Sequence, residues 1–317
     1  MDSRTKYIFV VILAALIVAL ESITIEASLN IWDVGLFAVS SIPSVIAGLV
    51  IMGIVPKPVM SSARSFGRKG WTMMLTMGFL FALGSLLWFD AVGRIGASKE
   101  ALLGGGSSEV LFIVLLSAVF LKEKLSRWEL SGGFLIIGGV VLVLINTEDI
   151  SLGIGFGELE AITSSFLLGI SVVILTKMLR QYPILPISAL ELLLSGLMLL
   201  AMGIAAGLIS FPTLSDWIIL LIISSFPALG FLTYNLGLRR VGASITSVLF
   251  ALTGILTVVI QVTIVFLIRD TDFILPEHIL LATAGGVVAF VGVYILHMNP
   301  GSGSAADQLA EPGALVK

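Results

Sequence analysis

Residues 82–98 read ALGSLLWFDAVGRIGAS, and residues 228–244 read ALGFLTYNLGLRRVGAS, at a constant offset of 146 positions. Eight of the 17 aligned positions are identical, and the closing Arg-x-Gly-Ala-Ser pattern is kept as a unit. Chance similarity between two apolar segments would not preserve this polar turn and the glycine spacing together. The pair therefore indicates an internal duplication of the chain.

The duplication extends downstream of this pair. Residues 119–121 (VFL) recur at the same offset as residues 265–267. After a seven-residue insertion in a loop, the glycine pattern of the first copy also recurs in the second. The matched glycines are Gly132, Gly133 and Gly139 in the first copy and Gly285, Gly286 and Gly292 in the second.

The composition is that of a membrane protein. Hydrophobic residues make up 58% of the 317 residues and charged residues 12%, and the mean hydropathy is +1.14. A soluble protein of this length needs far more charge to cover its surface. Continuous apolar runs favour membrane-spanning helices over barrel strands, which alternate in polarity. We predict an all-α membrane protein with ten transmembrane helices, at residues 7–29, 34–55, 71–92, 97–121, 128–145, 155–176, 185–209, 215–238, 243–268 and 279–298.

Several classes of function are disfavoured by the residue content. The net charge is −3, without a basic or acidic block, which argues against a nucleic-acid partner. Cysteine is absent, so disulfides, thiolate metal sites and a cysteine nucleophile are excluded. The two histidines, His278 and His297, flank the last apolar run and support no metal centre. We therefore expect no cofactor, no metal and no enzymatic activity.

The distribution of Lys and Arg predicts the orientation. With a cytoplasmic N-terminus and ten spans, 14 of the 17 basic residues fall in inside segments, whereas Arg94, Lys99 and Arg269 fall outside. This asymmetry follows the positive-inside rule. The apolar run from residue 7 is interrupted by Glu21 and Glu26, and we interpret it as the first membrane helix rather than a cleaved signal peptide.

Each copy of the duplication holds five predicted helices. Because five is odd, the second copy must enter the membrane from the opposite side. We expect a first repeat at residues 1–147, an inverted second repeat at 148–298 and a disordered cytoplasmic tail at 299–317. Inverted repeats are typical of alternating-access transporters, whose sites lie near the midplane between the repeats. The alternative is a duplication that only builds a stable bundle.

Several of these motifs occur together in a known family. Gly-Ala-Ser opens the fourth and ninth predicted helices, at residues 96–98 and 242–244; residues 120–125 (FLKEKL) close the fourth, and paired glycines follow in the fifth. In this the chain resembles the drug/metabolite transporter superfamily, specifically its EamA-type ten-helix members. The resemblance implies transport of metabolites, amino acids or drugs. It also implies a central cavity lined mainly by helices one, three, four, six, eight and nine.

The chain departs from that family at one point in each repeat. The family usually has a proline about a dozen residues after each Ala-Ser, whereas residues 107–109 (SSE) and 253–255 (TGI) stand there in this sequence. We expect the helix to be broken instead at glycines, namely Gly104, Gly105 and Gly106 in the first repeat and Gly254 in the second.

Acidic residues inside the predicted spans are the first candidates for function. A carboxyl group in the hydrocarbon core costs several kcal/mol unless it is paired, hydrated or protonated. Glu109 lies within one residue of the middle of its helix, and Glu21 shares a helix face with Thr24 and Ser28. We predict that Glu109 and Glu21 bind substrate or couple protons; the alternative for Glu109 is a protonated, hydrogen-bonded structural residue.

Other acids have simpler explanations. Glu26 lies near the outer end of its helix and could reach water, and Glu191 could pair with Lys177. Glu158 and Glu160 begin a helix, where acids are favoured by the helix dipole.

Aromatic and amide side chains complete the candidate site. Trp88 and Tyr234 occupy equivalent repeat positions, and Asn235 follows Tyr234. Their rings could flank a ligand or stack on a cation; the alternative is an interfacial aromatic belt. Gln261 is a further candidate for ligand contact, and an interhelical hydrogen bond is the alternative for it.

The interior predicted for this chain is acidic and contains no base. No Lys or Arg falls in the middle of a predicted helix, which favours a cationic, zwitterionic or neutral substrate, or protons as the coupling ion. We predict a secondary active transporter, with export favoured, of small metabolites such as amino acids or amphipathic and cationic compounds. The alternative is a flippase for a lipid-linked or hydrophobic substrate. The expected partners are a small molecule and the bilayer of the cell membrane, with both termini cytoplasmic and a monomeric or homodimeric protein.

Overall fold

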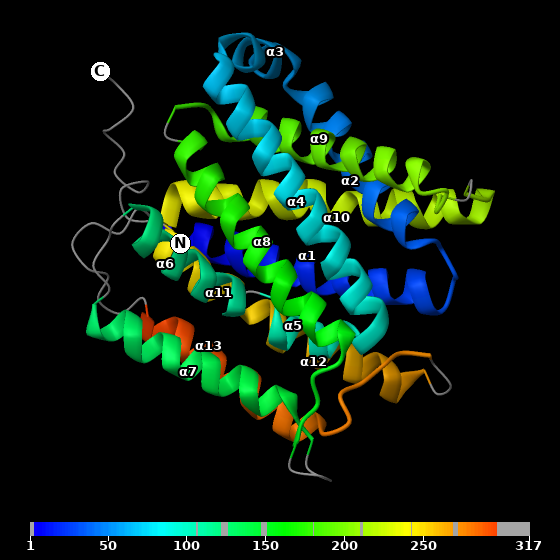
Figure 1. Ribbon diagram of the computed structural model, residues 1–317, viewed down its shortest axis with the longest axis vertical. Coiled ribbons are helices and arrows are strands. Elements are labelled where there is room, and N and C mark those ends of the chain that lie inside the picture. The colour runs from blue at the N-terminus through cyan, green and yellow to red at the C-terminus, as the bar shows by residue number, and fades with distance from the viewer. Residues whose placement is uncertain are drawn as a thin grey trace.

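The computed structural model describes residues 3–105, 107–121, 126–146, 151–179, 181–209, 212–241, 243–268 and 272–296. Within these ranges the chain is almost entirely helical (Figure 1). The helices are α1 (Ser3–Asn30), α2 (Leu36–Ile54), α3 (Pro56–Ser65), α4 (Arg68–Ile95), α5 (Ala97–Leu103), α6 (Ser107–Leu121), α7 (Arg127–Leu144), α8 (Phe156–Leu179), α9 (Ile184–Ala205), α10 (Leu214–Val241), α11 (Ala243–Phe250), α12 (Leu252–Leu267) and α13 (Ile279–Leu296).

The predicted spans correspond to these elements. In the described ranges, nine helical segments are long and apolar enough to cross a membrane. The remaining span consists of α5 and α6, which have 7 and 15 residues and together cover the predicted helix at 97–121. The two halves of the ninth predicted helix are likewise α11 and α12. The predicted ten-helix membrane fold is confirmed.

Two local elements were not expected from the sequence. Residues 56–70 lie between the predicted spans at 34–55 and 71–92, and most of them form α3, which begins with Pro56 in the first turn, a position that proline favours. Val59 of α3 is buried against the bundle, whereas Lys57 and Arg64 are exposed, so the helix is too polar to be recognised as a span. In addition, β1 (Ile145–Asn146) and β2 (Ser151–Leu152) form a two-residue antiparallel pair.

The two repeats pack against each other in a symmetric manner. α1, α2, α4 and α7 correspond to α8, α9, α10 and α13, and α5–α6 corresponds to α11–α12. α4 packs against α8 just as α1 packs against α10, and α6 packs against α8 just as α12 packs against α1, while α2 pairs with α9 and α7 with α13 (Figure 1). When each helix is replaced by its equivalent in the other repeat, the same set of helix pairs results. The bundle therefore has an approximate two-fold axis between its halves.

The direction of equivalent helices shows that the repeats are inverted. A Cβ added to Gly132 of α7 would lie 2.5 Å from the carbonyl oxygen of Gly292 in α13. One added to Gly139 would lie 2.4 Å from the carbonyl oxygen of Gly285. Residue numbers thus rise along α7 as they fall along α13, so the two equivalent helices are antiparallel. Both Gly-rich helices pack within the chain, where small residues allow the backbones to approach closely.

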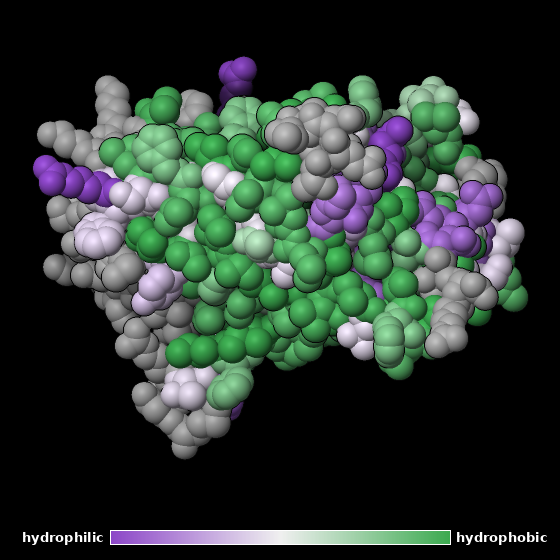
Figure 2. Space-filling model, turned by 90° about the horizontal axis from the view of Figure 1, so that it is seen from below, coloured by the Kyte–Doolittle hydropathy of each residue, from purple (hydrophilic) through white to green (hydrophobic). Residues whose placement is uncertain are grey.

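The outside of the bundle is suited to lipid. Large apolar side chains such as Phe134 of α7 and Leu280 of α13 are exposed. The face that carries these helices is mainly hydrophobic, with hydrophilic residues gathered toward its ends (Figure 2). Such an extended apolar surface is expected where lipid tails replace water.

Candidate functional site: a cavity between the repeats

A cavity of about 180 Å³ lies in the middle of the bundle. A single water needs roughly 10–15 Å³ on the same measure, so the cavity has room for a small solute. Its described wall comes from α1, α2, α4, α5, α6, α8, α9, α10, α11 and α12, with no residue from α7 or α13. The family resemblance implied most of these helices; α2 and α9 contribute as well, through Ser44 and Glu191.

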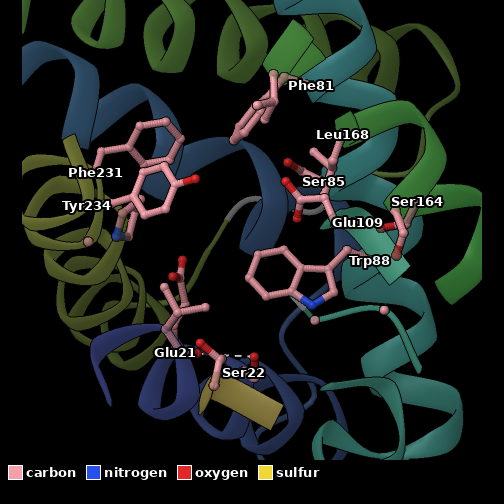
Figure 3. A pocket seen from close by; sticks show the side chains of 18 of the residues that line it. Glu21, Ser22, Phe81, Ser85, Trp88, Glu109, Ser164, Leu168, Phe231 and Tyr234 are labelled. Carbon is pink, nitrogen blue, oxygen red and sulfur yellow. Dashed lines mark hydrogen bonds between the residues drawn. The ribbon is translucent and has the colours of Figure 1, made fainter. Parts of the chain in front are cut away.

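Two facing walls of the cavity are equivalent in the repeats. Three of the wall residues of α4 and three of those of α10 are spaced i, i+4, i+7, which places each set on one helix face. They are related by the offset of 146 found in the sequence, so the cavity straddles the two-fold axis. These residues are Phe81, Ser85 and Trp88 in α4 and Pro227, Phe231 and Tyr234 in α10; all but Pro227 are labelled in Figure 3.

Four carboxyl groups line the cavity. They belong to Glu21 of α1, Glu100 of α5, Glu109 of α6 and Glu191 of α9. Among the described lining residues there is no Lys, Arg or His. Glu21, Glu100 and Glu191 are at most 5% exposed. The cavity therefore concentrates acidic groups without a basic counterpart, and the first repeat supplies three of the four.

Two of these carboxyl groups are held by other side chains. The Trp88 Nε1 donates a 2.8 Å hydrogen bond to Glu100 Oε2. The Ser171 hydroxyl donates to Glu191 Oε1 at 3.3 Å, and Ser171 also contacts the Met77 carbonyl. The suggested pair with Lys177 is not among the ion pairs of the described residues. Its Oε2 atom has no hydrogen-bond partner in the described part of the chain.

The other two carboxyl groups have no partner in the part of the chain that the structure describes. Neither Glu21 nor Glu109 makes a hydrogen bond or ion pair within the described residues. Figure 3 shows both side chains reaching into the cavity from different walls, Glu21 beside Ser22 and Glu109 near Ser85 and Trp88. Glu109 is also close enough to Glu100 and Tyr234 to interact with them electrostatically.

The helix break beside Glu109 follows from the glycines. α5 ends at Leu103 and α6 begins at Ser107, while Gly106 lies outside the described residues. A Cβ on Gly104 would lie 2.5 Å from Glu100 Oε1 and 3.0 Å from Ser165 Oγ, so this glycine leaves room for the carboxyl group and for α8. Ser108 Oγ donates to the carbonyl of Leu103. This carbonyl lies at the end of α5, where carbonyl groups lack a donor within the helix.

The second break lies elsewhere than expected. α11 and α12 meet at Ala251, whereas Gly254 is inside α12. A Cβ on Gly254 would lie 2.8 Å from the carbonyl oxygen of Ala101. Gly254 thus allows α12 to pack closely on α5 and does not itself interrupt the helix.

Gln261 belongs to a separate polar network and not to the described cavity wall. Its Nε2 donates to Glu26 Oε2 at 2.7 Å, and its Oε1 accepts from the Ser98 backbone N–H at 2.8 Å. Glu26 also accepts from the backbone N–H groups of Ala97 and Ile274, at 2.7 and 2.6 Å. Glu26 is fully buried, although its position near the helix end suggested contact with water. This Glu26–Gln261 network ties α1, α5, α12 and the segment before α13 together beyond the cavity.

The remaining candidates are distributed as follows. Trp88 and Tyr234 line the cavity, whereas the side chain of Asn235 is outside the described part of the structure. Glu158 pairs with Lys99 at 2.5 Å. Glu100 was missed because an acid in the first turn of a helix, beside a lysine, has a simple explanation in the helix dipole. Its spacing of four residues from Gly104 could have placed it on the cavity face.

Comparison with known proteins decides the family. The EamA-like transporter family matches this sequence twice, at residues 5–145 and 155–298, which covers nearly the whole chain. The chain belongs to the EamA-like transporter family. The double match also agrees with the duplication read from the sequence.

Relatives of this EamA-like transporter agree with that assignment. It is 24% identical over 271 residues to an uncharacterized transporter of Methanothermobacter thermautotrophicus, covering 80% of this chain and 76% of the relative. A solved structure titled only as the crystal structure of a protein matches 94% of this chain and 98% of its own, with a TM-score of 0.56 and 19% identity. This second likeness concerns the fold alone.

Proposed function

We propose that this EamA-like transporter is a secondary active carrier that exports small metabolites across the cell membrane by alternating access. The observation that carries the proposal is the acid-lined cavity between two inverted repeats. In transporters built from inverted repeats, the site lies at the repeat interface and the two halves exchange conformations around it. The symmetric walls provided by α4 and α10 suit this mechanism, because each can take the conformation of the other.

We take the Glu26–Gln261 network to hold one end of the bundle closed in this conformation. It joins α1, α5, α12 and residues 272–276 by short hydrogen bonds at the end of the bundle where α1 ends and α5 begins. Opening the cavity toward that side requires these segments to separate. We assign this side to the cell exterior.

The assignment of sides rests on the basic residues. α3 and the start of α4 carry Lys57, Arg64, Arg68 and Lys69 on the opposite side, which we place in the cytoplasm together with both termini. On the exterior side, the described basic residues Arg94 and Lys99 are engaged in ion pairs.

Proton coupling is the second part of the proposal. A carboxyl group in a water-poor site can take up a proton on one side and release it on the other as the cavity alternates. Glu109 is suited to this because it lies at the helix break, faces the cavity and has no partner among the described residues. Inward movement of protons would then drive export of the substrate.

Transport in liposomes tests this function. A thermal-shift screen against amino acids, amines, sugars and nucleosides first identifies solutes that stabilise the purified protein. We expect proteoliposomes to accumulate the best of these solutes when a pH gradient is imposed. We expect Glu109→Gln to abolish this accumulation while leaving the melting temperature of the unliganded protein near that of the wild type.

The matched control is Glu277→Gln, which makes the same chemical change at an exposed residue outside the cavity. It should transport like the wild type. Failure of the wild type to move any solute from the screen would overturn the carrier function. Unchanged pH-driven accumulation by Glu109→Gln would overturn the coupling role alone.

A further inference from the structure

The four cavity carboxyl groups differ in how many of their oxygen atoms are already hydrogen-bonded within the protein. Glu100 accepts from Trp88 through Oε2 and Glu191 accepts from Ser171 through Oε1, so each already has one oxygen engaged. Glu21 is 5% exposed and, like Glu109, has no hydrogen-bond or ion-pair partner among the described residues, although both line the cavity. Both carboxyl groups face the cavity without a donor among the described residues, so an occupant that donates hydrogen bonds to both would form charge-assisted bonds there.

The surroundings of Glu21 and Glu109 define the charge of such an occupant. The described wall offers no Lys, Arg or His to neutralise the carboxyl groups or to attract an anion. It offers the rings of Phe81, Phe231 and Tyr234 instead, which gather around the same space (Figure 3). Aromatic faces attract cations and accept apolar groups, and carboxylates form their strongest hydrogen bonds with cationic donors.

We infer that the cavity binds a protonated amine, with its ammonium group held between Glu21 and Glu109 and its apolar body against the aromatic wall. This inference rests on the proposed function and names the substrate class of the same site. An ammonium N–H donor satisfies the two carboxyl groups that have no partner among the described residues, which a neutral alcohol does less well and a carboxylate cannot do. A metal ion suits the site poorly, because no group of three or more His, Cys, Asp or Glu side chains in the described part of the chain is placed to hold one.

Three ligands of nearly the same shape test the inference: phenethylamine, 2-phenylethanol and phenylacetate. Their affinities are measured by isothermal titration on the purified full-length protein. We expect phenethylamine to bind about tenfold or more tightly than 2-phenylethanol, because two charge-assisted hydrogen bonds are lost with the ammonium group. Phenylacetate should not bind.

Variants that each remove one cavity carboxyl group test whether Glu21 and Glu109 bind the amine. Glu21→Gln and Glu109→Gln should each weaken phenethylamine binding about tenfold, while binding of the alcohol changes less than twofold. Glu277→Gln is the control and should leave all three affinities unchanged. If a variant does not fold, the ligand series on the wild-type protein still decides the charge preference.

Two results would overturn the amine inference: equal or tighter binding of the alcohol or the acid, or binding of none of the three. Full affinity for the amine in both cavity variants would also overturn it. Counterflow in proteoliposomes distinguishes failure of the amine inference from failure of the proposed carrier function. Transport of neutral solutes without amine binding would overturn the amine inference but support the proposed carrier function. Amine binding without transport of any solute would support the amine site but overturn the carrier function.

Discussion

Gln261 shows how a single amide side chain can hold several segments together. It donates to Glu26 and accepts from Ser98 in a buried place away from the described cavity wall. Gln261→Met keeps the shape but leaves Glu26 and the Ser98 N–H short of a partner. We expect this change to destabilise the folded protein by about 1–3 kcal/mol, measured by thermal unfolding in detergent. Ligand affinity should stay within about twofold of the wild type.

The control for Gln261→Met is Gln181→Met, at an exposed turn, which should have almost no effect on unfolding. An unchanged melting temperature combined with weakened ligand binding in Gln261→Met would contradict the structural role and indicate that Gln261 contacts the ligand. The sequence left the ligand role and the interhelical hydrogen bond open for Gln261. The partners that favour the structural role lie 163 and 235 positions away, and spacing along one helix carries no information about them.

At the element scale, α7 offers two adjacent glycines with opposite surroundings. A Cβ on Gly139 would meet the Gly285 carbonyl oxygen at 2.4 Å and the Ala289 backbone nitrogen at 2.6 Å, whereas a Cβ on Gly138 meets nothing within 4 Å. Gly139→Ala must push α7 away from α13 and should destabilise the protein by about 1–3 kcal/mol. Gly138→Ala should be neutral or stabilising by up to about 1 kcal/mol, because alanine favours the helix. Thermal unfolding of both variants in detergent measures the difference.

Equal melting temperatures for Gly138→Ala and Gly139→Ala would contradict the close packing of α7 on α13. The sequence predicted which stretches are helical here, because apolar length is a local property. It could not predict which side of a glycine faces a neighbour, as Gly254 shows. That glycine was expected to break its helix, but it serves a close contact with Ala101, and the break falls at Ala251. The short helix α3 was missed for the opposite reason, since its apolar face is too small to stand out.

At the scale of the whole molecule, the sequence was most informative. The duplication, the odd number of helices per repeat and the ten spans follow from patterns that cover many residues, so local errors do not change them. Part of the site follows from the same symmetry: Trp88 and Tyr234 are equivalent positions, and both line the cavity. Glu100 breaks that symmetry, because Thr246 stands at the corresponding position, and a repeat alignment gives no reason to select it.

The inverted arrangement makes a prediction about two equivalent residues. Lys69 at the start of α4 and Ser215 at the start of α10 are related by the offset of 146, and both are exposed. The chain has no cysteine, so Lys69→Cys and Ser215→Cys each introduce a single reactive thiol. We expect a membrane-impermeant maleimide to label Ser215→Cys in intact cells, and Lys69→Cys only after the membrane is opened. Gln181→Cys, placed on the cytoplasmic side with Lys69, is the control and should behave like Lys69→Cys. Labelling of Lys69→Cys and Ser215→Cys from the same side would mean that the repeats enter the membrane in one direction, and a cavity shared by opposed halves could not alternate between its two faces.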